Sequence, residues 1–370
     1  MKIAFMHPTY WPEVRRGSER LVHDLAAGLA ARGHELTLIT SHPGPGSVSA
    51  EDDVRVIRNR RPPWIRPLRF YEDHVASLPA SSWSLARGGF DLAHAFFPGD
   101  AWAAAQVRRR AAGPPFLFSL HGIPVRRYLV ERRYRLEMLR TAIDAAAATT
   151  VLSEAAAEAT RTYLIRSPLV IPGGVDLRSF AADVAPAPVP TVVCAASLQD
   201  PRKRPEVLFE AFGILRSRIP EARLRLIRSL DPLLAGWPAV TLPEGAEWVE
   251  ATGTDQLARE YAGAHVSVTA AVDEAFGLVL IESLAAGTPI VAARSGASAE
   301  IIDSDAIGRL FEPDDAEDLA RALEQGIVLG RDPATTAACR VAAARFDLEL
   351  LLDRYERLYE AALTGEPISA

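Results

Sequence analysis

Cysteine and lysine are both scarce in this chain of 370 residues. Cys194 and Cys339 stand far apart in apolar surroundings, so we predict two buried thiols and no disulfide. No cluster of Cys and His has zinc spacing, which argues against a structural metal. No run approaches the roughly 18 uncharged apolar residues that a membrane span needs, and residues 1–6 lack a signal-peptide pattern. These absences predict a globular, cytoplasmic protein.

Positive charge is carried almost entirely by arginine, because Lys2 and Lys203 are the only lysines among the 41 basic residues. Residues 1–185 have a net charge of +6, and residues 186–370 have a net charge of −12. A basic N-terminal half could attract an anionic acceptor or a lipid surface. A coding bias towards Arg and Ala explains the same composition and is preferred, and no nucleic-acid partner is expected.

The N-terminal residues predict a strand-helix-strand unit. Lys2–His7 is a short apolar run, a loop follows, and Gly17-Ser18-Glu19 opens an amphipathic helix that Gly33 ends. Glu35–Thr40 is the next predicted strand. Such a unit implies a parallel sheet that binds its ligand at the carboxyl ends of the strands. Gly17 can bring the backbone close to a phosphate or a sugar there, although any turn can also require a glycine.

A histidine follows a later predicted strand, Phe116–Leu120, at the same kind of position. His121-Gly122 would lie at the carboxyl edge of the sheet, where open α/β sheets bind ligands. An imidazole suits hydrogen bonding or proton transfer at a reacting centre. The alternative is a histidine that only ends a strand; the position favours the functional interpretation. His7 and His94 have the most similar surroundings among the other histidines.

Two regions of the N-terminal half are candidates for acceptor contacts. Residues 59–84 are rich in Pro, Arg and aromatic residues, and we predict an irregular functional loop containing Trp64, Phe70 and Tyr71. Residues 125–140 predict an Arg-rich helix that includes Arg126. A solvated helix face is the preferred interpretation of these arginines, and membrane contact is the less favoured one.

An Ala/Pro-rich segment, residues 181–190, has the composition of a semi-rigid linker. A second series of alternating strands and helices follows it. The sequence therefore predicts an N-terminal domain over residues 1–182, a C-terminal domain over 183–346, and a terminal amphipathic helix within 347–370. Both domains are α/β and Rossmann-like, with parallel sheets.

The stretch Asp273–Ile302 is the most informative part of the second series. An acidic loop with Glu274 leads through Phe276-Gly277 into a helix that begins with Leu278 and Val279 and carries Glu282. The first turn of a helix presents unpaired N–H groups and can hold an anion. Two carboxylates beside such a turn suit an anionic ligand that also has hydroxyl groups, such as a sugar nucleotide. An ordinary crossover with a solvated glutamate is the alternative.

A basic turn follows the first strand of the second series. Arg202-Lys203-Arg204 comes after a strand end and before a helix. Arginine can bind a diphosphate in bidentate fashion and lysine can act as a point charge, although a solvated basic turn has the same pattern.

In this order, the segments resemble the retaining glycosyltransferases of family GT4, which have the GT-B fold. Glu274 to Glu282 fits the family's E-x7-E signature, and Ala286-Gly287-Thr288-Pro289 follows as expected. Val170–Asp176 is similar to the family's "VIPNGVD" segment. Gly17-Ser18-Glu19 and His121-Gly122 resemble its N-terminal glycine loop and its histidine near the donor sugar. The resemblance implies two domains that face each other across a cleft, with the C-terminal helix packing back towards the N-terminal domain.

The resemblance also implies roles for individual residues. Glu274 would bind hydroxyls of the transferred sugar, Glu282 would bind the ribose, and Lys203 would neutralise the diphosphate. The remaining donor contacts would come from Gly17, Ser18, Arg202 and the Phe276–Val279 backbone. The base would lie near Val249–Gly253 and the loop Arg228–Asp231. His121 would orient the sugar. The predicted acceptor contacts of Trp64, Phe70, Tyr71 and Arg126 come from the loop composition and the Arg-rich helix, not from the resemblance.

Three positions depart from the family's pattern. Ser197 stands where the family usually has an arginine, and we predict that Arg202 supplies that charge. Gly173 replaces the usual asparagine, and Ser295-Gly296-Ala297 stands where a Gly-Gly pair is common.

The predicted activity is transfer of a hexose or N-acetylhexosamine from a nucleoside-diphosphate sugar, by preference a UDP-sugar, to an acceptor hydroxyl. The acceptor is a small molecule, a sugar or a lipid, and the predicted front-face reaction needs no metal and no cofactor. Alternatives are an epimerase of nucleotide sugars and a silent sugar-nucleotide-binding protein. A phosphorylase of this fold needs a lysine for pyridoxal phosphate and is disfavoured.

Overall fold

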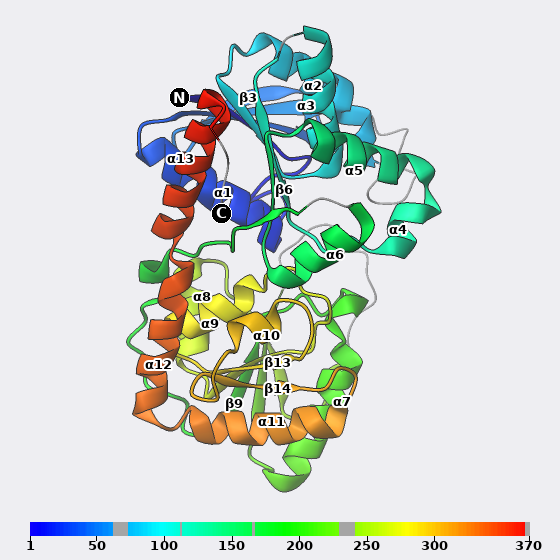
Figure 1. The fold of residues 1–370 in the computed structure, drawn as a ribbon. Helices are drawn as coiled ribbons and strands as arrows, with labels where there is room; N and C mark the ends of the chain where they lie inside the picture. The colour runs from blue at the N-terminus through cyan, green and yellow to red at the C-terminus, as the bar shows by residue number, and fades with distance from the viewer. Residues whose placement is uncertain (62–72, 112, 165–166, 229–240, 367–370) are drawn as a thin grey trace. The chain divides into compact units, whose positions relative to one another are not determined.

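The computed structural model describes residues 1–61, 73–111, 113–164, 167–228 and 241–366 (Figure 1). The chain forms two compact units. Unit 1 comprises Met1–Pro172 together with Leu348–Ala370, and unit 2 comprises Gly173–Asp347.

Unit 1 is built on an eight-stranded sheet in the order β3-β4-β2-β1-β5-β6-β7-β8. β3 and β4 are antiparallel, and all other neighbours are parallel. Its strands are β1 (Lys2–Met6), β2 (Glu35–His42), β3 (Ser47–Glu51), β4 (Val54–Arg60), β5 (Leu92–Ala95), β6 (Phe116–Leu120), β7 (Ala148–Val151) and β8 (Leu169–Val170). Its helices are α1 (Gly17–Ala31), η2 (Asp73–Ser77), α2 (Leu78–Arg87), α3 (Pro98–Ala111), α4 (Arg126–Glu131), α5 (Arg133–Ala145), α6 (Glu154–Leu164) and α13 (Leu348–Thr364).

Unit 2 is built on a six-stranded parallel sheet in the order β11-β10-β9-β12-β13-β14. Its strands are β9 (Thr191–Cys194), β10 (Arg223–Ile227), β11 (Ala246–Val249), β12 (Val266–Thr269), β13 (Ile290–Ala293) and β14 (Gly308–Phe311). Its helices are η3 (Leu177–Phe180), η4 (Pro201–Lys203), α7 (Pro205–Arg218), α8 (Thr254–Ala262), α9 (Leu278–Ala286), α10 (Ser298–Ile301), α11 (Ala316–Leu329), α12 (Pro333–Ala343) and η6 (Ala344–Phe346).

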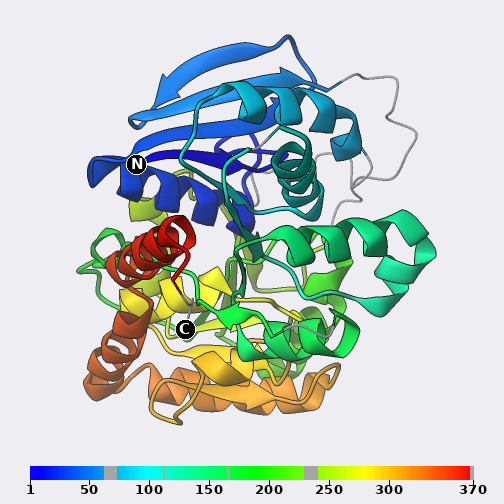
Figure 2. The ribbon, with the colours of Figure 1, turned by 45° about the horizontal axis from the view of Figure 1, so that its top comes forward.

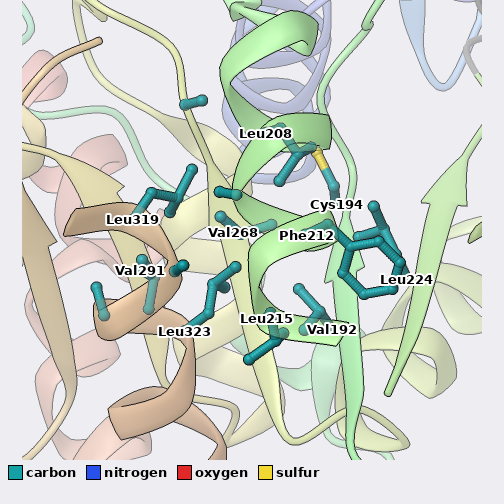
Figure 3. Close-up of a cluster of buried hydrophobic side chains, with 14 of the residues drawn as sticks. Val192, Cys194, Leu208, Phe212, Leu215, Leu224, Val268, Val291, Leu319 and Leu323 are labelled. Carbon is teal, nitrogen blue, oxygen red and sulfur yellow. The ribbon is translucent and has the colours of Figure 1, made fainter. Parts of the chain in front are cut away.

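The core of unit 2 shows why its strands consist of uninterrupted apolar residues. Both faces of the sheet are buried, so neighbouring residues in β9 and β13 are all inaccessible to solvent. On one face, Leu208, Phe212 and Leu215 of α7 interdigitate with Leu319 and Leu323 of α11 (Figure 3). Cys194 lies in this core, and both cysteines are free and buried, which confirms that prediction.

The C-terminal helix α13 packs on unit 1, as predicted. It lies beside α1 (Figure 2), and Gly28 of α1 leaves room for the Leu352 side chain, which an added Cβ would approach to 2.8 Å. Arg32 contacts three α13 carboxylates, which belong to Glu349, Asp353 and Glu356. These partly exposed ion pairs contribute modestly, and the buried contacts of α13 fix its position more strongly.

A buried polar network also joins α13 to the sheet of unit 1. His94 in β5 bonds to the Tyr359 hydroxyl at 2.7 Å and to the Ser119 hydroxyl at 2.6 Å. Ser119 also bonds to Thr150 at 2.6 Å and to the Tyr355 hydroxyl at 2.9 Å. Burial lowers the pKa of His94 well below its usual value, so the imidazole is neutral in this network.

The boundary between the units differs from the predicted one at residue 182. Residues 173–182 belong to unit 2, where Val175 forms a β-bridge with Asp347 and η3 packs against α8 and α9. The Ala/Pro-rich composition of residues 181–190 placed the predicted boundary after the observed one, which lies between Pro172 and Gly173. Composition does not reveal the tertiary contacts that hold η3 in unit 2.

Two segments of unit 1 differ from their predicted structure. Residues 78–84 were predicted to be irregular and instead belong to α2. The predicted helix over 125–140 is broken at Arg132, whose backbone is extended between α4 and α5. Arg135 is only 7% exposed, which corrects the interpretation that all these arginines form a solvated face. None of the helices in the described part of the chain is long and apolar enough to cross a membrane.

Candidate functional site

In unit 1 several polar side chains gather where neighbouring parallel strands end. From β1 the chain proceeds outward through β2 to β4 and returns on the other side of β1 with β5. Open α/β sheets bind ligands at such a reversal, outside the carboxyl ends of the strands. Here His7 follows β1, Phe96 follows β5 and His121 follows β6. We call this group, with Ser18 of α1, the His121 edge.

Ser18 connects the two histidines of the His121 edge. Its hydroxyl lies 2.9 Å from Nδ1 of His121 and 3.3 Å from Nε2 of His7. Nδ1 of His7 lies 2.5 Å from the carbonyl oxygen of Thr9, which can only accept, so that nitrogen carries the proton. Ser18 then donates to Nε2 of His7 and accepts from Nδ1 of His121. This tautomer leaves Nε2 of His121 as a hydrogen-bond acceptor.

Both histidines are neutral at physiological pH. Burial, followed by the neighbouring His7, lowers the pKa of His121 to about 3. Burial likewise lowers the pKa of His7, against the attraction of Glu19. A neutral His121 with an unprotonated Nε2 can accept a hydrogen bond from a ligand hydroxyl, but it cannot supply a positive charge. The geometry therefore suits the predicted orienting role.

Glu19 and Thr9 support the start of α1. Glu19 is buried, and one of its carboxylate oxygens accepts a 2.7 Å hydrogen bond from the Thr9 hydroxyl. Gly17 is the exposed first residue of the helix, after an extended Arg16 that makes no side-chain cap. The predicted Gly17 and Ser18 are thus positioned by Thr9, a residue that sequence reasoning did not single out.

Asp100 is a further residue that sequence reasoning missed. It lies in the first turn of α3, shortly after β5, and is only 1% exposed. Burial raises the pKa of this carboxyl to about 7, and Oδ2 has no hydrogen-bond partner among the described residues. Its place five residues beyond the end of β5 was the signal available in the sequence.

Substituting Asp100→Asn is expected to stabilise the protein most at alkaline pH. The folded carboxyl binds a proton up to about pH 7 and the unfolded one only up to about pH 4, so Asp100 lowers stability as pH rises through this range. One pKa unit is worth ~1.4 kcal/mol, so the shift of about three units sets an upper limit of ~4 kcal/mol on the gain at pH 8, and we expect the melting temperature to rise more at pH 8 than at pH 5. Calorimetric scans at both pH values measure this gain, and a gain that is larger at pH 5 contradicts the burial of a titrating carboxyl.

In unit 2 the corresponding reversal of the sheet lies between β9 and β12, and the loop after each strand contributes one side chain. Lys203 ends η4 after β9, and Glu274 lies in the loop after β12. Nζ of Lys203 and Oε2 of Glu274 are 2.5 Å apart, with both side chains mostly buried. The structure therefore brings together the two charged residues that the resemblance assigned to the diphosphate and the sugar. We call this pair and the first turn of α9 the Lys203–Glu274 edge.

The backbone around this pair is held in a tightly specified conformation. Arg204 and Asp273 have left-handed φ angles of 49° and 53°. Gly296, at φ 56°, packs so closely that a Cβ would lie 2.4 Å from the Glu274 carbonyl oxygen. That oxygen accepts a 2.9 Å hydrogen bond from the Ala297 N–H. The segment that replaces the family's Gly-Gly pair thus keeps the one glycine that the Glu274 loop requires.

α9 begins at this edge. Gly277, at φ 84°, precedes the first helical residues Leu278 and Val279. The N–H groups of a first helical turn have no partner within the helix and can bind an anion. Phe276 is buried against Phe346, with ring centroids 5.8 Å apart, which fixes the entry into the helix.

Glu282 lies one turn further along α9. It is 4% exposed, and Oε2 accepts a 3.3 Å hydrogen bond from the Tyr261 hydroxyl of α8. Its location on the helix agrees with the predicted arrangement, but its side chain is more deeply buried than a solvated glutamate would be.

Arg202 is directed towards Asp200 rather than towards the Lys203–Glu274 pair. Its guanidinium binds the Asp200 carboxylate at 2.5 Å, and its side chain is 76% exposed. Burial raises the pKa of Asp200, but the hydrogen bonds from Arg202 outweigh this effect, so the pKa is lowered overall. That Arg202 compensates for Ser197 remains a prediction.

The remaining predicted contacts are only partly described. Trp64, Phe70 and Tyr71 lie outside the described residues, as does the loop Arg228–Asp231 except for Arg228. The Arg228 N–H donates to the Val249 carbonyl at 2.9 Å, at the end of β11. Arg126 is exposed as the first residue of α4. Over the part of the chain that the structure covers, no group of three or more metal-binding side chains occurs, and metal independence remains a prediction.

Two family models match the chain in succession. The model described as "Glycosyltransferase Family 4" matches residues 15–179, and the one described as "Glycosyl transferases group 1" matches residues 189–327.

Curated relatives carry glycosyltransferase names. A D-inositol 3-phosphate glycosyltransferase from Geodermatophilus obscurus is 30% identical over 220 residues, which are 53% of this chain and 48% of the relative. The chain thus spans about half the length of this relative and of a second one from Saccharomonospora viridis. A phosphatidyl-myo-inositol mannosyltransferase from Mycobacterium tuberculosis is 26% identical and aligns over 97% of both chains.

Solved structures share the fold. A sucrose-phosphate synthase from Thermosynechococcus elongatus superposes with a TM-score of 0.82 at 22% identity, over 98% of this chain and 99% of that one. Anabaena HepE in complex with UDP-glucose superposes with a TM-score of 0.75 at 18% identity, over 98% of this chain and 100% of that one. At these identities the likeness shows the two-sheet GT-B fold alone.

Proposed function

Because this chain belongs to the family 4 glycosyltransferases, we propose that it transfers a hexose or N-acetylhexosamine from a nucleoside-diphosphate sugar to an acceptor hydroxyl. The anomeric configuration is retained, and no metal takes part. Unit 2 binds the donor, and unit 1 binds the acceptor.

The observation that carries this proposal is the Lys203–Glu274 pair at the reversal of the unit 2 sheet. A donor presents a diphosphate next to a sugar with several hydroxyls. The Lys203 ammonium group can neutralise the diphosphate, and the Glu274 carboxylate can accept hydrogen bonds from the sugar hydroxyls. The two charged side chains therefore match two adjacent parts of one ligand. In this structure the two side chains form an ion pair with each other.

The proposed reaction breaks the bond between the anomeric carbon and the phosphate oxygen and forms one from that carbon to the acceptor oxygen on the same face. The acceptor hydroxyl proton passes to the departing phosphate oxygen, so no oxidant or added base is required. Lys203 and the first-turn N–H groups of α9 stabilise the charge that develops on this diphosphate. This stabilisation is the main contribution that the chain makes to the rate.

His121 has an orienting role in this proposal. Its neutral Nε2 accepts a hydrogen bond from a hydroxyl of the transferred sugar, and the chain through Ser18 to His7 keeps that nitrogen unprotonated. The low pKa of His121 makes general-acid chemistry at neutral pH unfavourable.

UDP is the preferred nucleotide. Support comes from HepE, which shares the fold and was solved with UDP-glucose, and the inositol-directed names of the relatives support a hydroxyl-rich or lipid acceptor. These names belong to other proteins, so donor and acceptor must be tested on this chain.

The test combines nucleotide binding with product analysis. Thermal unfolding is measured with UDP, GDP, ADP and TDP, because a ligand that binds the folded state raises the melting temperature. The UDP-sugar that binds is then incubated with candidate acceptors in EDTA, and NMR of the product gives its anomeric configuration. We expect UDP to stabilise most and the product to retain the donor's configuration.

Other outcomes identify the alternatives. An isomerised sugar in the absence of any acceptor identifies an epimerase. Donor affinity with neither transfer nor slow donor hydrolysis identifies a silent binding protein. Loss of activity in EDTA that Mg²⁺ restores contradicts the metal-independent mechanism.

A further inference from the structure

A line of contacting rings leads from β5 to the His121 edge. The ring centroids of His94 and Phe96 are 3.9 Å apart, and the Phe96 centroid lies 5.2 Å from that of His121. Packed aromatic rings have centroids up to about 7 Å apart, so Phe96 contacts both imidazoles. Phe96 is 2% exposed and also packs against Phe5 of β1, at 5.0 Å. The tilt of the His121 ring therefore depends on the position of Phe96, and through it on His94.

The orientation of the His94 ring is fixed at both of its nitrogens. Nδ1 lies 2.7 Å from the Tyr359 hydroxyl of α13, and Nε2 lies 2.6 Å from the Ser119 hydroxyl of β6. Because burial lowers the pKa of His94, the neutral ring has one nitrogen that donates and one that accepts. Within the described part of the chain, the buried Tyr359 hydroxyl has no second partner, so its proton goes to Nδ1. Nε2 of His94 therefore donates to Ser119.

The three remaining hydroxyls agree with this assignment. Ser119, Thr150 and Tyr355 have their hydroxyl oxygens 2.6, 2.9 and 3.3 Å from one another, so each can donate once around the triangle. Ser119 keeps a lone pair for His94, and every buried proton then has an acceptor. With the opposite tautomer of His94, the Tyr359 proton would be buried without an acceptor, which is costly. The network thus holds His94 in one tautomer and one orientation.

We propose that this network positions His121, so that the C-terminal helix α13 sets the orientation of the imidazole that faces the transferred sugar. The positioning residues are Tyr359, His94 and Phe96, in order from α13 to the site. Ser18 holds Nδ1 of His121, and the Phe96 ring limits rotation of the imidazole about that hydrogen bond. Hydrogen bonds weaken steeply away from a linear arrangement, so the direction of Nε2 decides how well it binds a sugar hydroxyl. The inference rests on the proposed function and adds residues that act on its orienting histidine.

An alternative role of the network is anchorage of α13 alone, and Tyr355 separates the two roles. Tyr355 and Tyr359 both lie on α13 and are almost completely buried. The Tyr355 hydroxyl bonds to Ser119 and Thr150, whereas the Tyr359 hydroxyl bonds to His94. Phenylalanine at either position keeps the ring and removes one buried hydroxyl. Only the change at Tyr359 releases the His94 ring.

The test compares Tyr359→Phe with the matched control Tyr355→Phe. In Tyr359→Phe, we expect kcat for sugar transfer to fall roughly 10-fold, because a misdirected group at a reacting centre loses much of its effect on the rate. UDP affinity, measured by calorimetry, should be unchanged, since UDP lacks the sugar that His121 orients. In Tyr355→Phe both hydrogen bonds of His94 remain, so kcat should stay near the wild-type value. Each variant loses one buried hydroxyl, so their melting temperatures should fall by similar amounts.

NMR of the His121 ring protons gives a readout that anchorage of α13 does not change. The neighbouring Phe96 ring shifts these resonances, because an aromatic ring alters the local magnetic field. We expect them to move in Tyr359→Phe and to keep their wild-type positions in Tyr355→Phe. If Tyr359→Phe does not fold, Phe96→Leu replaces it, since it removes the ring that contacts His121 and leaves the hydrogen bonds of His94 in place. The same loss of kcat with unchanged UDP affinity is expected there.

Two results overturn the inference while leaving the proposed function intact. One is a wild-type kcat together with unmoved His121 resonances in Tyr359→Phe. The other is an equal fall of kcat in both tyrosine variants, which would assign the network to the anchorage of α13. If the wild-type protein neither binds UDP nor hydrolyses the donor, the proposed function is overturned instead, and the His121 resonances alone then decide whether α13 orients the imidazole.

Discussion

Replacing Lys203 or Glu274 with alanine is expected to reduce sugar transfer at least ~100-fold, as removal of one charge-stabilising group from a reacting centre typically does. The two losses differ in kind. Lys203→Ala removes the cation opposite the diphosphate and should weaken donor binding as well as kcat. Glu274→Ala removes the acceptor for sugar hydroxyls but leaves Lys203 available to the diphosphate, so we expect a loss in kcat with donor affinity largely kept.

Steady-state kinetics and calorimetry with UDP separate these effects. In the double variant the losses should not add, because the two side chains are in direct contact at 2.5 Å. Arg218→Ala is the control: it removes an exposed α7 arginine that pairs with Glu317 and Glu324, and should leave transfer unchanged. Near-wild-type transfer in both single variants would eliminate the assignment of this edge to the donor.

The elements best predicted from the sequence are those with strong local signals. α9 begins and ends where its glycines and apolar spacing place it, with Gly277 and Gly287 in left-handed conformations on either side. β14 has no such signal, because Gly308–Phe311 is short and contains an arginine. It becomes a strand only by pairing with β13. β3 likewise lacks a strong local signal, since its residues are mostly exposed and it becomes a strand only by pairing with β4.

The candidate site also combines features that the sequence predicts with features that it does not. The chain order of the motifs was sufficient to select Lys203 and Glu274, because both follow strands that lie side by side at the reversal of a parallel sheet. Their direct contact, and the way Arg202 turns to Asp200, depend on backbone angles that the sequence does not specify. The Ser18 hydroxyl contacts His121, which lies 103 positions further along the chain, and the burial of Asp100 and Arg135 depends on packing between elements. Such non-local features decide protonation and ring orientation, and they are visible only in three dimensions.

Glu282→Gln is expected to weaken UDP binding by roughly 10- to 100-fold and to abolish the preference for ribose over deoxyribose. A carboxylate that accepts from ribose hydroxyls forms charge-assisted hydrogen bonds worth about 1.5–3 kcal/mol each. An amide of the same shape forms weaker ones, and its carbonyl oxygen can still accept from the Tyr261 hydroxyl that now bonds to Glu282. The α8–α9 contact, and with it the stability of the unliganded protein, should therefore be retained.

Calorimetry with UDP and 2′-deoxy-UDP measures this preference directly. The wild-type protein should bind UDP at least ~10-fold more tightly than the deoxy nucleotide, because the 2′-hydroxyl is one of the groups that the Glu282 carboxylate would recognise. In Glu282→Gln the ratio should approach one. Glu260→Gln is the control, since Glu260 lies on α8 and pairs with Arg225, and it should keep the wild-type ratio. A ratio that is the same in the wild-type protein and in Glu282→Gln would show that the ribose is bound elsewhere, and that Glu282 serves only to anchor α9 to α8.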